Sequence, residues 1–326
     1  MDLNIHQRYL IEEFAEEYHE RKLGRRDLVK RVLLVTGSVP TTAAALLALG
    51  CGSDAEDKAT ASATSAAATS TLVATPTGSP AATATGTPVT SGPGVPANDP
   101  AVVGGDVRFP GPASDLLGYL ARPRDGGPSA GILIIHENRG LTEHFKDVSR
   151  RYAKEGFVAL AIDLVSRDGG SKADTNQNTG FLGRSAPADL TADLVAGVQY
   201  LKTQPFVRPA ALGVTGFCFG GGYTWETAIA SLDVKAAVPY YGTAPLDRIG
   251  RIRAAVLAMY GEADARITSQ APEVERILRA TGTTIEVKIY PGAGHAFFND
   301  TGANYNAAAA ADAWPRTLAW FRKYLA

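Results

Sequence analysis

The chain has 326 residues, which is enough for one large domain or two smaller ones. Its formal net charge is −1, so the overall charge gives no reason to expect a nucleic acid partner. The two cysteines, Cys51 and Cys218, lie in unlike settings, which excludes a disulfide framework.

The chain opens with a polar segment that has the spacing of an amphipathic helix. Within residues 1–24, the apolar side chains of Leu10, Ile11, Phe14 and Tyr18 recur every three or four positions. This periodicity predicts a short helix with one buried face. Its composition indicates no catalytic role.

Residues 25–50 resemble a twin-arginine export signal. The run RRDLVK at residues 25–30 has the paired arginines, the following apolar residue and the later lysine of such signals. The apolar stretch at residues 32–50 contains small and polar residues, so it suits the central region of a signal better than a stable membrane-spanning helix. An internal helix and a true membrane anchor are the alternatives.

The apolar stretch ends in LALGC, with the cysteine at position 51. This ending resembles a bacterial lipoprotein box, in which the cysteine thiol accepts a diacylglyceryl group and becomes the mature N-terminus. Ala48 stands where a leucine is usual, so cleavage by an ordinary signal peptidase stays open. We therefore expect residues 1–51 to direct export, with the twin-arginine machinery as partner, and Cys51 to attach the protein to membrane lipid outside the cytoplasm.

A change of composition divides the rest of the chain into a linker and a folded domain. Residues 52–100 consist almost entirely of Ala, Thr, Ser, Pro, Gly and Val, which predicts a disordered tether. From residue 101 to residue 326, apolar runs alternate with helical periodicity. We expect one domain there, because about 225 residues suffice for it.

Eight apolar runs within this domain are predicted to be strands. The first two form an antiparallel hairpin, and the others alternate with helices, which is typical of a mostly parallel sheet of about seven or eight strands with helices on both faces. The runs are residues 102–109, 116–121, 131–136, 157–162, 212–217, 234–240, 254–260 and 285–290.

The strand at residues 212–217 leads directly into the motif GFCFGG, residues 216–221. Its G-x-C-x-G pattern is that of a nucleophile elbow, with Cys218 in the position usually taken by serine. Such an elbow places the thiol at the carboxyl edge of a sheet. Small flanking residues are needed because the backbone turns sharply and packs closely.

A thiol nucleophile requires a base, and the base requires an orienting carboxylate. His295 is the only histidine after Cys218, and it lies in a glycine-rich loop past the last predicted strand. Asp264 is the best candidate for the acid, because it follows the strand at residues 254–260. Glu262 is the rival, while Asp233 and Asp247 are less well placed and are expected to be surface charges.

The oxyanion hole is expected to use the backbone N–H of Phe219, directly after the nucleophile. Asn138, in the loop after the strand at residues 131–136, is our candidate for the second donor. We predict no metal or cofactor site. His136 and His144 lack ligand spacing, and no glycine-rich stretch has dinucleotide-binding or P-loop spacing.

From about residue 103 onward, the chain resembles the dienelactone hydrolase (carboxymethylenebutenolidase) family. The matching motifs occur in family order across the domain: HExxG at 136–140, AxAxDL at 159–164, GFCFGG at 216–221, YYG at 240–242, GxxD at 261–264 and GHAF at 294–297. The resemblance implies an α/β-hydrolase fold and a catalytic triad of Cys218, His295 and Asp264. It also implies that Glu137 contacts the thiol and controls its proton.

The resemblance extends to substrate binding, with one departure. Where family members that cleave dienelactone carry an arginine for the substrate carboxylate, four residues beyond the histidine, this chain has Asn299. An amide does not replace a bidentate guanidinium. The candidate substrate-binding residues are Arg139, Arg184, Tyr240, Tyr241 and Phe297.

These observations predict a hydrolase that cleaves a small carboxylic ester or lactone through an acyl-enzyme on Cys218. The alternative is a surface-tethered binding lipoprotein on a hydrolase scaffold that has lost activity. A complete triad argues against this alternative. The sequence predicts neither the natural substrate nor the oligomeric state.

Overall fold

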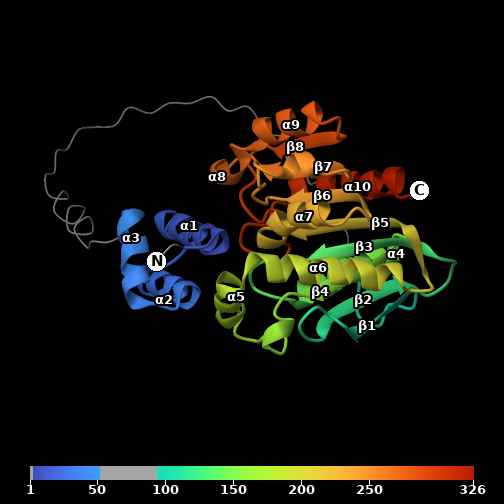
Figure 1. Ribbon diagram of the computed structural model, residues 1–326, viewed down its shortest axis with the longest axis horizontal. Coiled ribbons are helices and arrows are strands. Elements are labelled where there is room, and N and C mark those ends of the chain that lie inside the picture. Colours follow the sequence, from blue (N-terminus) through green and yellow to red (C-terminus); the bar gives the residue numbers. More distant parts are fainter. Residues whose placement is uncertain (1–2, 52–93) are drawn as a thin grey trace, which may run out of the picture. The chain divides into compact units, whose positions relative to one another are not determined.

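The computed structural model describes residues 3–51 and 94–326, which form two separate compact units (Figure 1). The predicted linker falls outside the described residues, except for its last seven positions, residues 94–100. These seven residues belong to the second unit. The backbone N–H of Val95 donates to the Asp147 carboxylate at 2.6 Å, and Asp99 forms an ion pair with Lys154, also at 2.6 Å.

The N-terminal unit consists of three helices, α1 (Ile5–His19), α2 (Arg25–Thr36) and α3 (Val39–Ala48). The start of α1 is stabilised by a capping box, in which the Asn4 and Gln7 side chains each accept from the other's backbone N–H. The buried apolar side chains of this unit include Leu10, Ile11, Phe14, Leu28, Val32, Val35, Ala45 and Leu46. The helix predicted within residues 1–24 is therefore present.

The apolar stretch predicted as the centre of an export signal is divided between two helices. Gly37 ends α2 in the left-handed conformation with a φ of 66°, and the Ser38 side chain then caps α3. Because of this break, neither helix is long. Among the helices in the described ranges, none combines the length and hydropathy that crossing a bilayer would require.

The second unit is built on one eight-stranded sheet with the order β1-β2-β4-β3-β5-β6-β7-β8. β1 and β2 form the predicted antiparallel hairpin, β2 is also antiparallel to β4, and every pairing from β4 to β8 is parallel. The strands span Val102–Phe109, Leu116–Pro123, Ser129–Ile135, Val158–Asp163, Val207–Phe217, Val234–Tyr240, Ala255–Gly261 and Ile285–Tyr290.

Helices cover both faces of this sheet (Figure 1). Gly197 of α6 (Pro187–Lys202) lies against Leu133, whereas Phe321 of α10 (Ala307–Tyr324) lies near Gly213, beside Ile132. Neighbouring residues of a strand point to opposite faces, so α6 and α10 cover opposite sides. α7 (Phe219–Ala230) packs beside α6, and Tyr152 of α4 (Glu143–Lys154) contacts Trp314 and Phe321 of α10.

The remaining helices are short, and two of them, the single turn α8 (Ala265–Thr268) and the longer α5 (Thr175–Arg184), were not predicted. α9 (Ala271–Ala280) matches the helix expected between the last two strands, and α8 follows β7. The longer unpredicted helix, α5, has the N-cap Asp174. Its residues are mostly polar or small, so they carry no clear apolar period.

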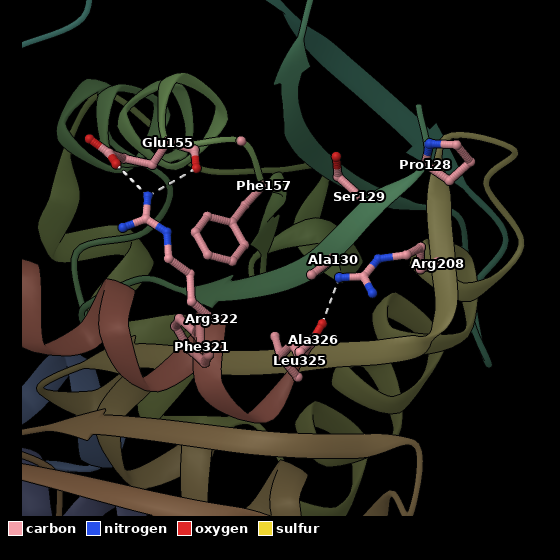
Figure 2. Close-up of a pocket in the computed structure, with 11 residues that line it drawn as sticks. Pro128, Ser129, Ala130, Glu155, Phe157, Arg208, Phe321, Arg322, Leu325 and Ala326 are labelled. Atoms are coloured by element: carbon pink, nitrogen blue, oxygen red, sulfur yellow. Dashed lines mark hydrogen bonds and ion pairs between the residues drawn. The ribbon is translucent and has the colours of Figure 1, made fainter. Parts of the chain in front are cut away.

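The C-terminal residues lie at the amino ends of β3 and β5, where they line a pocket of about 290 Å³ (Figure 2). The guanidinium of Arg208 donates to the backbone oxygen of Leu325 at 2.6 Å. Arg322 pairs with Glu155 at 2.7 Å. This pocket and these contacts therefore lie at the end of the strands opposite the elbow, which follows the carboxyl end of β5.

Candidate active site

Cys218 stands at a strained turn between β5 and α7, with φ 57° and ψ −118°. Positive φ is unusual for a residue other than glycine and marks a site where the surroundings enforce the conformation. Those surroundings are tight, because a Cβ at Gly216 would overlap the carbonyl oxygen of Gly220. A Cβ at Gly220 would overlap the carbonyl oxygen of Ile135 at the end of β3. The predicted nucleophile elbow is therefore present in the backbone.

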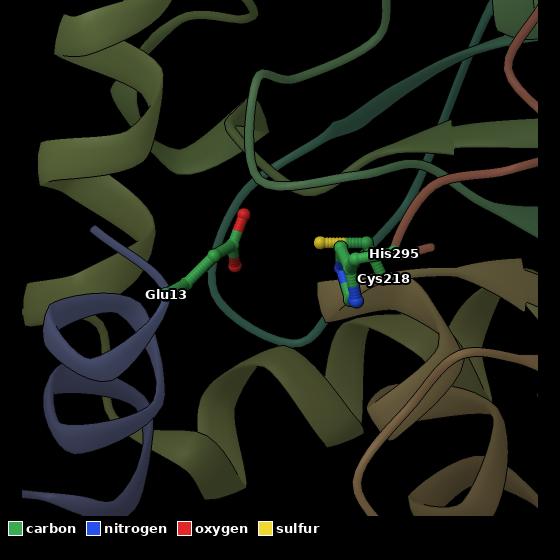
Figure 3. Close-up of side chains that lie close together, drawn as sticks. All are labelled: Glu13, Cys218 and His295. Carbon is green, nitrogen blue, oxygen red and sulfur yellow. The ribbon is translucent and has the colours of Figure 1, made fainter. Parts of the chain in front are cut away.

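His295 and Asp264 meet at the same edge of the sheet. Asp264 follows β7, His295 follows β8, and the His295 Nδ1 lies 2.6 Å from Oδ2 of Asp264. A carboxylate can only accept, so Nδ1 carries the proton and donates. The other ring nitrogen remains for the thiol, and the reactive atoms of Cys218 and His295 lie within 4.8 Å (Figure 3).

The rival acid, Glu262, lies away from the imidazole. Its side chain is exposed, and its Oε2 accepts from the backbone N–H of Gly292 at 3.0 Å. Asp264 is 1% exposed, so its carboxylate reaches His295 with little competition from water. Of the two acids considered, Asp264 makes the hydrogen bond that orients the imidazole.

The electrostatic surroundings of His295 favour its protonated form. Burial alone would lower the pKa of this imidazole, but the negative charge of Cys218 and the hydrogen bond to Asp264 outweigh it. The pKa of His295 is therefore raised well above the usual 6.5. This combination favours an imidazolium beside a thiolate, the reactive form of a cysteine nucleophile.

Glu137 lies in the loop after β3 and is buried. Its Oε2 accepts a hydrogen bond from Nδ2 of Asn299 at 2.9 Å, while its Oε1 has no hydrogen-bond partner in the described part of the chain. Asn299 therefore contacts the carboxylate that the resemblance assigns to control of the thiol proton. The sequence identified both residues but did not predict this bond.

Phe219 and Asn138 follow neighbouring parallel strands. Ile135 of β3 pairs with Gly216 of β5, so the loops that follow these two strands meet at one edge of the sheet. Phe219 begins α7, where backbone N–H groups point outward from the helix end. The carbonyl oxygen of Asn138 accepts from Thr179 at 3.0 Å, which fixes this loop. That the backbone N–H groups of Phe219 and Asn138 act as oxyanion donors stays a prediction.

The structure separates the two adjacent tyrosines predicted to bind substrate. The Tyr240 hydroxyl is 2.6 Å from Oγ1 of Thr317, so this side chain points into the interface with α10. The ring of Tyr241 instead packs edge-on against His295 at 5.2 Å and against Phe297 at 5.3 Å. Tyr241 thus borders the Cys218–His295 pair, and the ring of Phe297 packs against the ring of Tyr241.

The other candidate residues differ in burial. Arg139 and Arg184 are both exposed, the second of them at the end of α5. Cys51 belongs to the N-terminal unit, where its Sγ is 3.7 Å from Nε2 of His19. Burial raises the pKa of the Cys51 thiol.

Sequence reasoning gave no role to two histidines that hold the site together. His136 donates from Nδ1 to the carbonyl oxygen of Glu137 at 2.6 Å and accepts at Nε2 from the N–H of Leu164, which joins the ends of β3 and β4. Burial lowers the pKa of His136, consistent with its neutral form. His144 bonds to Asp300, in the loop that carries His295, at 3.0 Å. The only signal in the sequence was the position of His136 at the end of a buried strand.

Comparison with known proteins identifies relatives across this second unit. The model of the "Dienelactone hydrolase family" matches residues 116–325. A "putative carboxymethylenebutenolidase" of Methylorubrum extorquens is 37% identical over 238 residues, covering 68% of this chain and 82% of the relative. One of Escherichia coli strain K12 is 34% identical over 244 residues, covering 69% and 89%.

Solved structures agree with these sequence matches. The crystal structure of a "putative dienelactone hydrolase" from Klebsiella pneumoniae has a TM-score of 0.63 at 33% identity, covering 69% of this chain and all of that one. A dienelactone hydrolase-like promiscuous phosphotriesterase from metagenomic libraries has a TM-score of 0.61 at 26% identity, with the same coverage. With this fold and these relatives, the chain belongs to the dienelactone hydrolase family and is a hydrolase.

Proposed function

We propose that this hydrolase cleaves small carboxylic esters or lactones through an acyl-enzyme on Cys218. The observation that carries the proposal is the chain of contacts from Asp264 to His295 to Cys218, assembled from three separate loops at one edge of the sheet. The strained elbow and the raised pKa of His295 support it. Both features activate a thiol for attack on a carbonyl.

The proposed reaction has two halves. The Cys218 thiolate attacks the carbonyl carbon, and the resulting oxyanion accepts hydrogen bonds from the N–H groups of Phe219 and Asn138. The imidazolium of His295 then protonates the departing alcohol oxygen, leaving a thioester. In the second half, neutral His295 takes a proton from water, which attacks the thioester and regenerates the thiolate.

Asn299 restricts the substrates we expect. The resemblance places a carboxylate-binding arginine at this position, whereas the Asn299 amide is neutral and already donates to Glu137. Glu137 is a buried carboxylate whose charge acts on Tyr241, as that of Cys218 does, so an anionic substrate would meet repulsion without a compensating cation. We therefore propose that uncharged esters or lactones are preferred to substrates with a free carboxylate.

The central test is hydrolysis of p-nitrophenyl acetate by the full chain. Cys218→Ala should abolish turnover, and wild-type protein trapped during turnover should show one added acetyl group on the peptide that contains Cys218. Cys218→Ala with undiminished turnover would refute the proposal. The Cys51→Ala variant is the matched control, because it removes the other thiol and should leave turnover unchanged.

We also propose that residues 1–51 direct export and that Cys51 is lipidated. Arg25 and Arg26 are exposed at the start of α2, where a receptor for paired arginines can reach them. Lipidation requires Cys51 to leave its buried position beside His19. For lipidation, cells fed labelled palmitate should label the wild-type protein but not the Cys51→Ala variant. For export, replacing both arginines by lysine should retain the protein in the cytoplasm. Absence of label in the wild-type protein would refute lipidation.

A further inference from the structure

Tyr241 occupies an unusual backbone position at the carboxyl end of β6. Its φ is 39°, in the left-handed region that a bulky side chain rarely enters. The backbone N–H of Tyr241 donates to the carbonyl oxygen of Met259 at 2.8 Å, which ties this turn to β7. Residues held in strained conformations cluster at sites where the exact direction of a side chain matters.

The direction of the Tyr241 side chain is set by rings on several sides. It packs against His295 at 5.2 Å, Phe297 at 5.3 Å, and Phe217 at 6.3 Å. Phe217 directly precedes the nucleophile, and His295 is the proposed base. The phenol is therefore fixed between the two elements that bring Cys218 and His295 together.

The hydroxyl of Tyr241 is buried, and its own hydrogen has no acceptor within the described part of the chain, while the backbone N–H of Phe298 donates to its oxygen. The hydrogen of a buried hydroxyl normally has an acceptor. The hydroxyl of Tyr240 is paired with Thr317, and the hydroxyl of Tyr290 donates to Asp312. The negative charges of Glu137 and Cys218 act on the Tyr241 hydroxyl. It thus lies close to the reacting groups, with a donor hydrogen that no protein group in the described residues uses.

The phenol keeps this hydrogen at every pH at which the enzyme would work. Burial raises the pKa of Tyr241 most, and the charges of Glu137 and Cys218 raise it further, to well above 10. A group of this kind can donate a hydrogen bond but does not give up its proton. Its chemical role is therefore that of a neutral donor to an oxygen that gains negative charge.

We propose that Tyr241 is a further catalytic residue, whose hydroxyl donates a hydrogen bond to the departing alcohol oxygen of the substrate. The inference rests on the function proposed above. The sulfur–carbon bond of the acyl-enzyme is formed, the carbon–oxygen bond breaks, and the departing oxygen receives its proton from His295. Tyr241 lies against His295, so its hydroxyl shares the charge on that oxygen while retaining its own proton.

The test compares esters of one acid with different alcohols, using kcat/KM of the full chain. For Tyr241→Phe, we expect a loss of roughly 100-fold with ethyl butyrate, whose alcohol is a poor leaving group. With p-nitrophenyl butyrate the loss should be much smaller, because nitrophenolate leaves without help. A loss of equal size for both esters, or no loss, would overturn the proposal.

Tyr260→Phe is the matched control. Tyr260 is also fully buried, its hydroxyl hydrogen also lacks an acceptor in the described residues, and burial alone raises its pKa. We expect Tyr260→Phe to leave both rates unchanged. The alkylation rate of Cys218 and the melting temperature of Tyr241→Phe should match those of the wild type, which shows that the site is intact.

The outcome also separates this inference from the proposed function. If Cys218→Ala abolishes turnover while Tyr241→Phe shows no dependence on the alcohol, only the role of Tyr241 is refuted. If Cys218→Ala remains active, the acyl-enzyme proposal itself is wrong.

Discussion

Asp264 shows how one hydrogen bond distinguishes two candidate acids. Glu262 and Asp264 stand two positions apart, but only Asp264 contacts Nδ1 of His295. We expect Asp264→Asn to reduce kcat on the order of 10³- to 10⁴-fold, because an amide can hold the imidazole in the wrong tautomer. Glu262→Gln is the control and should keep full activity. The reverse pattern, measured with p-nitrophenyl acetate, would assign the acid to Glu262.

The charge on His295 should be visible in the reactivity of Cys218. A nearby imidazolium stabilises the thiolate, so iodoacetamide should alkylate wild-type Cys218 rapidly at pH 6–7, well below the usual thiol pKa of about 8.5. In His295→Gln the rate should be low at that pH and rise only as the solution approaches the ordinary thiol pKa. Mass spectrometry of the peptide containing Cys218, in a Cys51→Ala background, measures the rate. Identical pH profiles for the two proteins would contradict the ion pair.

Asn299 should determine whether the site accepts a carboxylate. Replacing it by arginine introduces a cation beside Glu137 and a donor for anionic substrates. We expect Asn299→Arg to raise kcat/KM for the mono-p-nitrophenyl ester of succinate relative to p-nitrophenyl butyrate by roughly tenfold. Asn299→Gln keeps the amide and should not change this ratio. An unchanged ratio in Asn299→Arg would show that another residue sets this preference.

At the scale of elements, the elbow depends on contact between backbones. A methyl group at Gly216 would overlap the carbonyl oxygen of Gly220, which cannot move without distorting the start of α7. We expect Gly216→Ala to lower the free energy of unfolding by about 1–3 kcal/mol and to remove activity. Gly105→Ala on β1 is the control, because a Cβ there meets no atom within 4 Å. Urea unfolding followed by circular dichroism measures both.

The loop that carries His295 is held to α4 by a charged cluster. Asp300 accepts from His144 and forms an ion pair with Arg151 at 2.5 Å. Burial raises the pKa of Asp300, but the bonds to His144 and Arg151 outweigh this effect and lower it below the usual 3.8. The folded state therefore gains stability from ionised Asp300. That gain is present above pH 3.8 and is lost as the pH falls through the lower pKa of the folded state.

At the scale of the whole molecule, this cluster should contribute to acid sensitivity. We expect Asp300→Asn to lower the free energy of unfolding by about 1–3 kcal/mol at pH 7, with a smaller difference from the wild type at pH 3. Asp106→Asn is the control, because the Asp106 side chain is 75% exposed in its pair with Lys146. Denaturant unfolding at both pH values provides the measurement. A difference as large at pH 3 as at pH 7 would contradict the linkage.

Much of the second unit could be predicted because its signals are local. β3, β4 and β7 read as continuous apolar runs, and seven of the eight strands lie within two residues of their predicted positions, while β5 begins five residues earlier than predicted. The motif GFCFGG predicted the elbow because few side chains can occupy so sharp a turn. α5 was not predicted because it carries no such local signal: its polar and small residues show no apolar period.

The sequence by itself therefore determined most of the elements, the elbow and the chain order of the candidate nucleophile, acid and base. The tertiary structure alone decided which side chains meet, because contacts between distant loops leave no local period. Asn299 lies 162 positions from Glu137, yet the two are hydrogen-bonded. Tyr240 and Tyr241 are adjacent in sequence, but one bonds to α10 and the other borders His295. The turn that ends β6, where Tyr241 has a φ of 39°, contributes to this difference in surroundings.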